Sequence, residues 1–226
     1  MNKSRLMTLG PVMFFAIILS SLTLAANDPP NDVVNAAESG IRDLIKSGVF
    51  HDLDLLGFPG QHEIDDAALG EGFQIFTVGT AVLVGDTATS DLSTNAYPLE
   101  LWQFLVMSRS EARCILTVGR VKGKWTAVSI GATGLAMRLS GAMKAWPRSL
   151  GYQYRFIRLY QASSDFLELS GTAAVIGFLP LASAREALNL KSRDFDVHDI
   201  RSSWDILNEI RPVVKANLQK GEGEKR

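Results

Sequence analysis

The segment 102–130 contains the most regular pattern of the chain, and this pattern restricts the folds that the chain can adopt. Three runs within it alternate with the two-residue period of β-strands, namely 102–107, 113–118 and 125–130. The joints between these runs, at 108–111 and 120–124, have the length that antiparallel neighbours use. The segment therefore predicts a three-stranded antiparallel meander.

Helical and extended patterns flank this meander in blocks. Apolar residues at three- and four-residue spacing predict helices at 32–45, 135–143, 182–188 and 197–218. Thr133 is a candidate cap for the second of these helices, and Pro212 should kink or divide the last one. Short apolar or alternating runs predict further strands at 73–78, 81–84, 152–160, 165–169 and 172–178. Residues 49–72 are predicted to be loop, with one helical turn at 65–69.

The order of these elements indicates the fold class. Helices and strands come in blocks rather than in strict alternation, which argues against a doubly wound parallel sheet. We therefore expect an α+β fold with a largely antiparallel sheet of about six to eight strands, flanked by helices. No boundary rich in Pro, Gly or Ser interrupts residues 32–218, so a single domain is predicted there. Residues 27–31 are expected to form a linker, and residues 219–226 a mobile polar tail.

The first 26 residues have the organisation of an export signal. Lys3 and Arg5 precede an uncharged segment that runs from Leu6 to Ala26. Small residues near Ala25 suggest cleavage there or one residue later, which predicts a periplasmic or secreted protein without a stable membrane span. The alternative is an uncleaved signal that anchors the protein to the inner membrane, because the uncharged segment approaches the length of a spanning helix.

Charge and cysteine usage exclude some classes of protein. The formal net charge is −1 and the basic residues are scattered, so no basic stripe predicts a nucleic-acid partner. Cys114 is the only cysteine, which excludes an intramolecular disulfide. Its position in the middle of a predicted strand favours a small buried apolar residue over a catalytic nucleophile.

Aromatic and arginine side chains provide the first candidate site. Tyr154, Arg155, Arg158 and Tyr160 fall in one predicted strand, and Tyr and Arg are enriched at binding hot spots. They predict a surface that binds a ligand or a partner. The competing interpretation is a half-buried strand with one polar face.

Histidines in the predicted loop provide a second, weaker candidate. His51 lies near acidic residues, and His62 lies close to Glu63 and Asp65. Imidazoles and carboxylates of this kind can bind a metal, but the spacing lacks the two histidines on one helical face that metalloproteases use. We therefore expect no metal and no other cofactor.

These observations favour one function over two alternatives. The favoured function is an exported, non-catalytic domain that binds an envelope protein or a small ligand, because no catalytic set is recognisable. The first alternative is an exported hydrolase or metal-dependent enzyme that uses the loops of His51 and His62. The second is a structural subunit of an envelope complex, for which a broad apolar surface patch would be the evidence.

Overall fold

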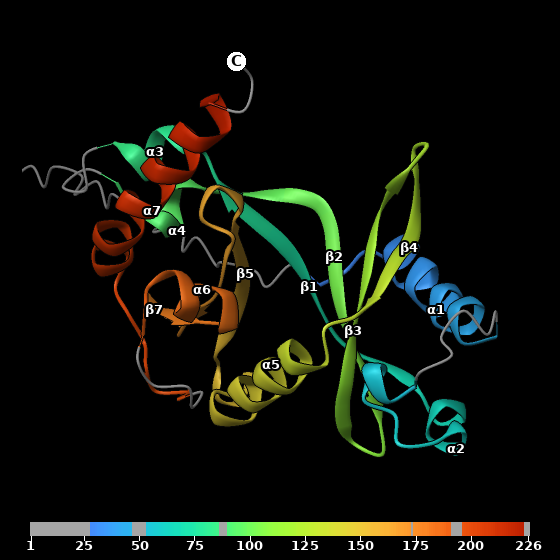
Figure 1. The fold of residues 1–226 in the computed structure, drawn as a ribbon. Helices are drawn as coiled ribbons and strands as arrows, with labels where there is room; N and C mark the ends of the chain where they lie inside the picture. Colours follow the sequence, from blue (N-terminus) through green and yellow to red (C-terminus); the bar gives the residue numbers. More distant parts are fainter. Residues whose placement is uncertain (1–27, 47–52, 86–89, 173, 191–195, 224–226) are drawn as a thin grey trace, which may run out of the picture.

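The structure is a computed structural model that describes residues 28–46, 53–85, 90–172, 174–190 and 196–223. Within these ranges seven strands form one sheet in the order β4-β3-β2-β1-β5-β6-β7 (Figure 1). The strands are β1 Ala68–Val78, β2 Ala96–Ser108, β3 Glu111–Val121, β4 Lys124–Gly131, β5 Gln153–Leu159, β6 Ser164–Ser170 and β7 Val175–Pro180. The predicted export signal at 1–26 and His51 lie outside the described residues.

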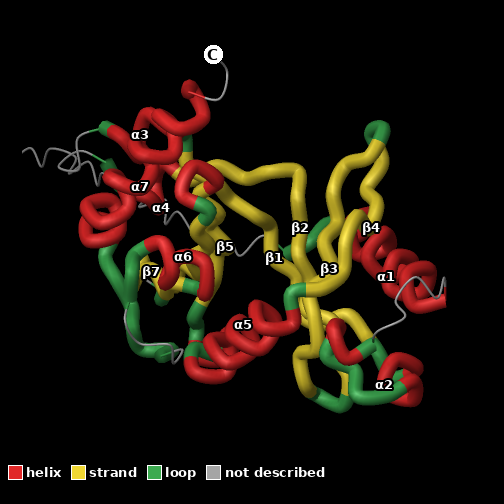
Figure 2. The backbone as a smooth tube through the Cα atoms, viewed as in Figure 1, coloured by secondary structure: helices red, strands yellow, loops and turns green. Residues whose placement is uncertain are grey.

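The described residues also form seven α-helices and three short 3-10 helices, coloured red in Figure 2. The α-helices are α1 Asn31–Lys46, α2 Gln61–Asp65, α3 Thr80–Val84, α4 Leu92–Asn95, α5 Thr133–Ala145, α6 Ala182–Ala187 and α7 Ser203–Gly223. The 3-10 helices are η1 Asp54–Leu56, η2 Arg148–Leu150 and η3 Tyr160–Ala162. No helix in the described part of the chain is long and apolar enough to span a membrane.

The sheet consists of two antiparallel halves joined by one parallel pair. Strands β1 to β4 form a meander in chain order, and β5 to β7 form a second one. The halves meet where β1 and β5 run parallel, with Ile75 opposite Phe156 and Phe76 opposite Ile157. The α+β fold with a largely antiparallel sheet is therefore confirmed, as is the three-stranded meander of 102–130.

Three apolar clusters show how the helices cover the sheet. Helix α5 covers one face, where its apolar side packs on residues from both halves of the sheet, including Phe73, Leu105 and Phe156. Helices α1 and α2 cover the opposite face of β2 and β3. Helices α3, α4 and α7 cover the same face as α1 and α2, but over the half of the sheet that β5 to β7 form. Phe166 and Ile210 are buried there. The sheet is thus the central layer between helices on both sides.

Two of the predicted elements between residues 65 and 84 are wrong. Residues 81–84 form helix α3 rather than a strand, because a short apolar run does not distinguish the two, and here Leu83 packs against the α7 side. The helical turn predicted at 65–69 lies one turn earlier, in α2, and β1 already begins at Ala68. The polar sequence that follows α2 belongs to the half-buried start of that strand.

The last helix begins later than predicted and is not divided. Residues 197–198 form a turn instead, and Arg201 makes an isolated bridge to Phe178 of β7 through two backbone hydrogen bonds of 2.9 Å. Ser202 and Asp205 then bind each other's backbone N–H groups, at 3.1 and 3.3 Å, which is the reciprocal cap that starts a helix. Helix α7 runs through Pro212 to Gly223, so the predicted division is wrong.

Gly40 allows helix α1 to lie close to strand β4. A Cβ atom added at Gly40 would be 2.1 Å from the Cβ of Ala127, which is far inside van der Waals contact. Glycine weakens a helix interior by roughly 0.5–1 kcal/mol relative to alanine. The close contact between helix and strand explains why this position nevertheless holds glycine.

We predict that Gly40→Ala destabilises the protein, although alanine is the better helix former. The added methyl group must push α1 away from β4, and overpacking of this kind costs about 1–3 kcal/mol. Urea unfolding would measure the loss, with Asn35→Ala on the exposed side of the same helix as the control, which should be neutral or slightly stabilising. An unchanged or increased unfolding free energy for Gly40→Ala would contradict the packing described.

Candidate functional site

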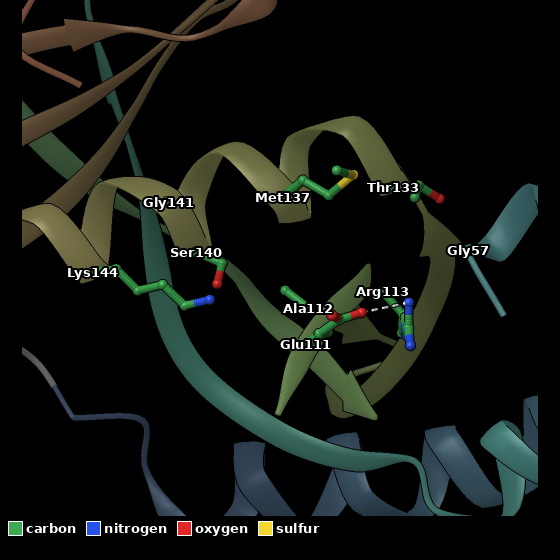
Figure 3. Close-up of a pocket in the computed structure, with 9 residues that line it drawn as sticks. All are labelled: Gly57, Glu111, Ala112, Arg113, Thr133, Met137, Ser140, Gly141 and Lys144. Atoms are coloured by element: carbon green, nitrogen blue, oxygen red, sulfur yellow. Dashed lines mark ion pairs between the residues drawn. The ribbon is translucent and has the colours of Figure 1, made fainter. Parts of the chain in front are cut away.

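A cavity of about 370 Å³ lies between helix α5 and the start of strand β3 (Figure 3). Its lining residues are Gly57, Glu111, Ala112, Arg113, Thr133, Met137, Ser140, Gly141 and Lys144. The volume falls within the range of about 300–1,000 Å³ in which proteins bind small molecules. The cavity is open on one side, so a ligand can enter it from solvent.

The β2–β3 turn fixes the strand side of the cavity. Arg109 and Ser110 both have positive φ, 50° and 66°, which is the backbone of the tightest hairpin turn. This turn places Glu111 and Arg113 at the first positions of β3, with their side chains on the same side of the strand. The Ser108 hydroxyl donates a hydrogen bond of 2.9 Å to the backbone carbonyl of Glu63, which ties α2 to this turn.

A partly buried charge cluster holds Arg113 in place. Its guanidinium lies 2.7 Å from the carboxylate of Glu63 and 2.9 Å from that of Glu111. Glu63 also pairs with Arg109 at 3.4 Å. Arg113 is therefore positioned and largely neutralised by its neighbours, so it shapes the wall of the cavity more than it adds free positive charge.

The helix side of the cavity is fixed at the start of α5. Ala132, the residue before the helix, has φ 57°, and Thr133 donates a hydrogen bond of 2.9 Å to the carbonyl of Leu55. Thr133 thus anchors η1 to the helix. The predicted cap of α5 by its side chain is wrong. Gly57 has φ +76°, and a Cβ there would be 2.9 Å from the carbonyl oxygen of Arg113, so only glycine lets η1 and β3 meet.

Three side chains of α5 line the cavity at successive helical turns. Figure 3 shows Met137, Ser140 and Lys144 along the helix, with the Lys144 ammonium and the Ser140 hydroxyl on one side of the cavity and Glu111 and Arg113 on the other. Met137 is 63% exposed. The cavity therefore combines an apolar wall with polar groups at both ends, an arrangement suited to reversible binding.

The described residues of the predicted histidine–carboxylate site, His62, Glu63 and Asp65, do not line this cavity, although Glu63 contacts the lining residue Arg113. His62 and Asp65 are exposed on α2, whereas Glu63 is buried and its carboxylate faces two arginines. Among the described residues no group of three or more His, Cys, Asp or Glu side chains could hold a metal ion. Within the described residues, Glu63 thus serves to position Arg113.

The structure does not bring the four predicted binding residues together on one exposed surface. Tyr154 is buried, and its hydroxyl donates to the backbone carbonyl of Trp146. Arg155 points to the opposite face of the sheet, because successive residues of a strand alternate. Tyr160 follows the strand in η3 and is 52% exposed.

Both arginines of this strand are held by carboxylates of β6. Nε and Nη2 of Arg155 donate to the fully buried carboxylate of Glu168 at 2.7 Å each, and the hydroxyl of Ser93 donates to the same carboxylate at 2.6 Å. Arg158 donates to Asp165 at 2.7 and 3.0 Å. Burial alone would lower the pKa of Arg158, but the hydrogen bond and charge of Asp165 raise it overall. These pairs connect strands within the fold.

The cavity beside this strand is too small for a ligand. It lies near Tyr154 and Arg155 and measures about 20 Å³, which is room for about one water molecule. Burial, and then the charge of Glu71, raise the pKa of Tyr154, so its phenol stays protonated and can keep its hydrogen bond.

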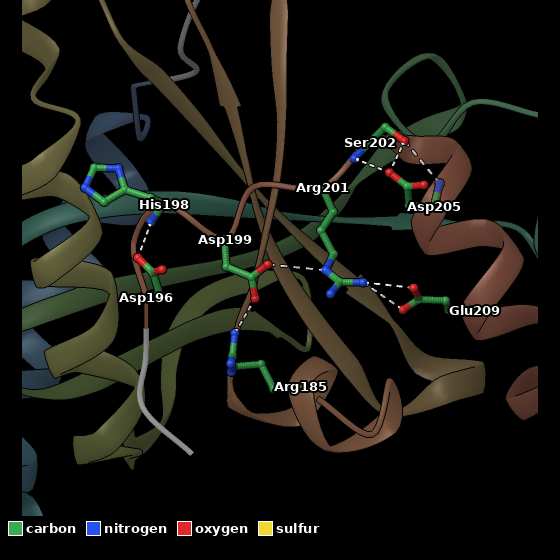
Figure 4. A network of polar contacts seen from close by, with 8 residues as sticks. All are labelled: Arg185, Asp196, His198, Asp199, Arg201, Ser202, Asp205 and Glu209. Carbon is green, nitrogen blue, oxygen red and sulfur yellow. Dashed lines mark hydrogen bonds and ion pairs between the residues drawn. The ribbon is translucent and has the colours of Figure 1, made fainter. Parts of the chain in front are cut away.

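A second polar network lies along the edge of β7 (Figure 4). Asp199 lies 2.6 Å from Arg185 and 3.4 Å from Arg201, and Arg201 reaches Glu209 at 2.9 Å. The network connects α6, the segment at 199–202 that precedes α7, and α7 itself. Its charges are paired within the chain, and it fixes the segment that covers the edge of the sheet.

Cys114 is inaccessible, as its position in the sequence suggested. The side chain is fully buried between β3 and the α1 side of the sheet, and burial raises the pKa of its thiol to about 12. A nucleophilic cysteine needs the opposite, a lowered pKa and some exposure. Cys114 is therefore a core residue.

Sequence reasoning missed the cavity. Lys144, Ser140 and Met137 recur at the spacing of one helix face, but nothing in the sequence links that face to Glu111, which lies beyond another strand and two turns. The only local signal is the small pair Ser140 and Gly141, which leaves room beneath the helix.

We predict that Cys114 does not react with a thiol reagent in the folded protein near pH 8. The reagent attacks the thiolate, and a thiol with a pKa of about 12 is almost fully protonated there. The same reagent should modify one thiol per chain at once when guanidinium unfolds the protein. Rapid modification without denaturant would contradict the burial of this residue.

Comparison of the chain with protein-family models, with curated proteins and with solved structures finds no match in any of the three. No relative's activity, ligand or partner therefore bears on this chain. The function has to be inferred from the cavity between α5 and β3 and from the sequence pattern.

Proposed function

We propose that this protein is an exported, non-catalytic domain that binds a small ligand in the cavity between α5 and β3. The observation that carries this proposal is the cavity itself, with its volume of about 370 Å³ and its mixture of apolar and charged lining residues. Ligand sites in proteins combine concavity, apolar walls and a few polar groups that orient the ligand.

The lining residues favour binding over catalysis. The nine residues that line the cavity include no histidine, cysteine or tyrosine. Ser140 is the only serine among them, and the set contains no histidine that could activate it as a nucleophile. Glu111 and Lys144 lie on opposite sides of the cavity (Figure 3), which suits the orientation of a bound molecule.

A small ligand fits the observations better than a protein partner. The large apolar side chains exposed on the described surface are dispersed over different elements, including Tyr97 on β2, Leu150 in η2 and Trp204 on α7. Specific protein interfaces of standard size use a contiguous, well-packed patch instead. Met137 and Leu55 are the exposed apolar residues at or beside the cavity, where they would contact a ligand.

We predict that ligands of this cavity are lost when it is filled. Small metabolites that raise the thermal unfolding temperature of the wild-type protein should no longer do so in Ser140→Leu, because a leucine there occupies the space of the ligand. Ala145→Leu, at an exposed position five residues further along α5, is the control and should respond like wild type. A saturating ligand at one hundred times its Kd adds about 2.7 kcal/mol of stability. Equal stabilisation of Ser140→Leu would contradict the proposed site.

The proposed export rests on the sequence of residues 1–26. A positive start followed by an uncharged apolar segment is the pattern that export machinery recognises. Because the chain has a single cysteine, no disulfide within the chain can stabilise it outside the cytoplasm, and an apolar core must do so. The three buried clusters provide the core that such a domain needs.

We predict that residues 1–30 direct a fused reporter out of the cytoplasm. The reporter should be one that becomes active only after it forms disulfides, since these persist outside the cytoplasm. Replacing Ile17 and Ile18 with aspartate in the fusion should abolish activity, because charge interrupts the apolar segment. Reporter retained in the cytosol by the unmodified segment would contradict the proposed compartment, and fractionation would show whether the signal is cleaved.

A further inference from the structure

The two ends of the cavity carry opposite charge. Figure 3 shows Lys144 extending from α5 toward the space above β3, and Glu111 on the strand, with its carboxylate paired to Arg113. No ion pair joins them, and within the described residues Lys144 has no carboxylate within ion-pair distance. The side chain of Glu111 is 66% exposed, and its Oε2 lies 2.9 Å from Arg113. The cavity therefore offers a ligand the ammonium of Lys144 at one end and, at the other, the exposed carboxylate of Glu111, which also pairs with Arg113.

The middle of the cavity is apolar. Ala112 lies between the two charged ends on β3, and Met137 covers the same space from α5 (Figure 3). Methionine adapts its shape to different apolar groups because its side chain is unbranched and polarizable. The body of a ligand would displace water from these two side chains while its ends remain at the charged groups.

We propose, on the basis of the ligand-binding function above, that the cavity takes a small zwitterion with an apolar body, such as an apolar amino acid or a short apolar peptide. The carboxylate of the ligand binds Lys144 and Ser140. Its ammonium binds Glu111. Its apolar part lies between Ala112 and Met137.

Other ligand classes fit these residues less well. A ligand with only a negative charge can pair with Lys144 but gives Glu111 no partner besides Arg113, and a ligand with only a positive charge leaves Lys144 without an anionic partner. A neutral apolar ligand would remove water from both charged groups without replacing their hydrogen bonds, which is unfavourable. Only a dipolar ligand satisfies both ends of the cavity, and hydrogen bonds to charged groups are the stronger kind.

Isothermal titration of the purified protein with leucine, leucylleucine and aminocaproic acid tests this ligand class and the distance between its charges. The zwitterion that binds most tightly is then compared with its N-acetyl derivative, which lacks the cation, and with its amide, which lacks the anion. Each derivative should bind on the order of tenfold more weakly, because each loses one hydrogen-bonded charge. Equal binding of all three forms would overturn the proposal.

Two variants assign each charge of the ligand to its residue. Lys144→Gln should weaken binding of the zwitterion and of the N-acetyl derivative on the order of tenfold, but leave binding of the amide unchanged. Glu111→Gln should weaken binding of the zwitterion and of the amide, but leave that of the N-acetyl derivative unchanged. Lys215→Gln and Glu100→Gln, exposed charges on α7 and β2, are the matched controls. Equal weakening of all ligands by either variant would contradict the assigned contacts.

The outcome distinguishes the ligand class from the proposed function. If no zwitterion binds, while other small molecules bind and are lost in Ser140→Leu, the cavity is a ligand site and the zwitterion proposal is wrong. If ligands bind equally well to Ser140→Leu, the cavity is not the site and both proposals fail.

Discussion

The parallel pairing of β1 with β5 is the contact on which the rest of the structure depends. It joins two antiparallel meanders through only two facing residue pairs, Ile75 with Phe156 and Phe76 with Ile157. All four side chains are buried, so packing rather than the short ladder holds the junction. Helix α5 lies over this junction and contacts apolar residues from both meanders. Because the cavity is the space between α5 and β3, the junction also determines the position of the candidate site.

The two faces of the sheet have different roles. The face that α1, α2, α3, α4 and α7 cover is packed with large apolar side chains and contains Cys114. The face that α5 covers is packed with apolar side chains over β1, β5 and β6. The cavity lies on this same face, where the helix passes the start of β3. Small residues at that point, Ala112, Ser140 and Gly141, leave the space, and charged residues surround it. Rigid packing on one side of the helix thus supports an open cavity on the other.

Much of the fold followed from the sequence, but the site did not. The meander of 102–130 was predictable because its strands alternate with a two-residue period. Neighbouring residues such as Phe104 and Leu105 are both apolar, and they point to opposite faces of a sheet that helices cover on both sides. Short apolar runs such as 81–84 were ambiguous between strand and helix. The pairing of β1 with β5 and the placement of Lys144 and Glu111 around one cavity depend on contacts between distant segments, which no local pattern encodes. The arginines at 155 and 158 suggested binding but form pairs within the sheet.

The most direct test of the ligand site is to observe which methyl groups a bound ligand touches. Nuclear Overhauser effects between the ligand and methyl-labelled protein report contacts of this kind in solution. The account predicts such effects to the methyl groups of Met137 and Ala112, which face each other across the cavity. Effects confined to methyl groups elsewhere, for example those of exposed Val128 or Ile176, would show that the ligand binds at another site.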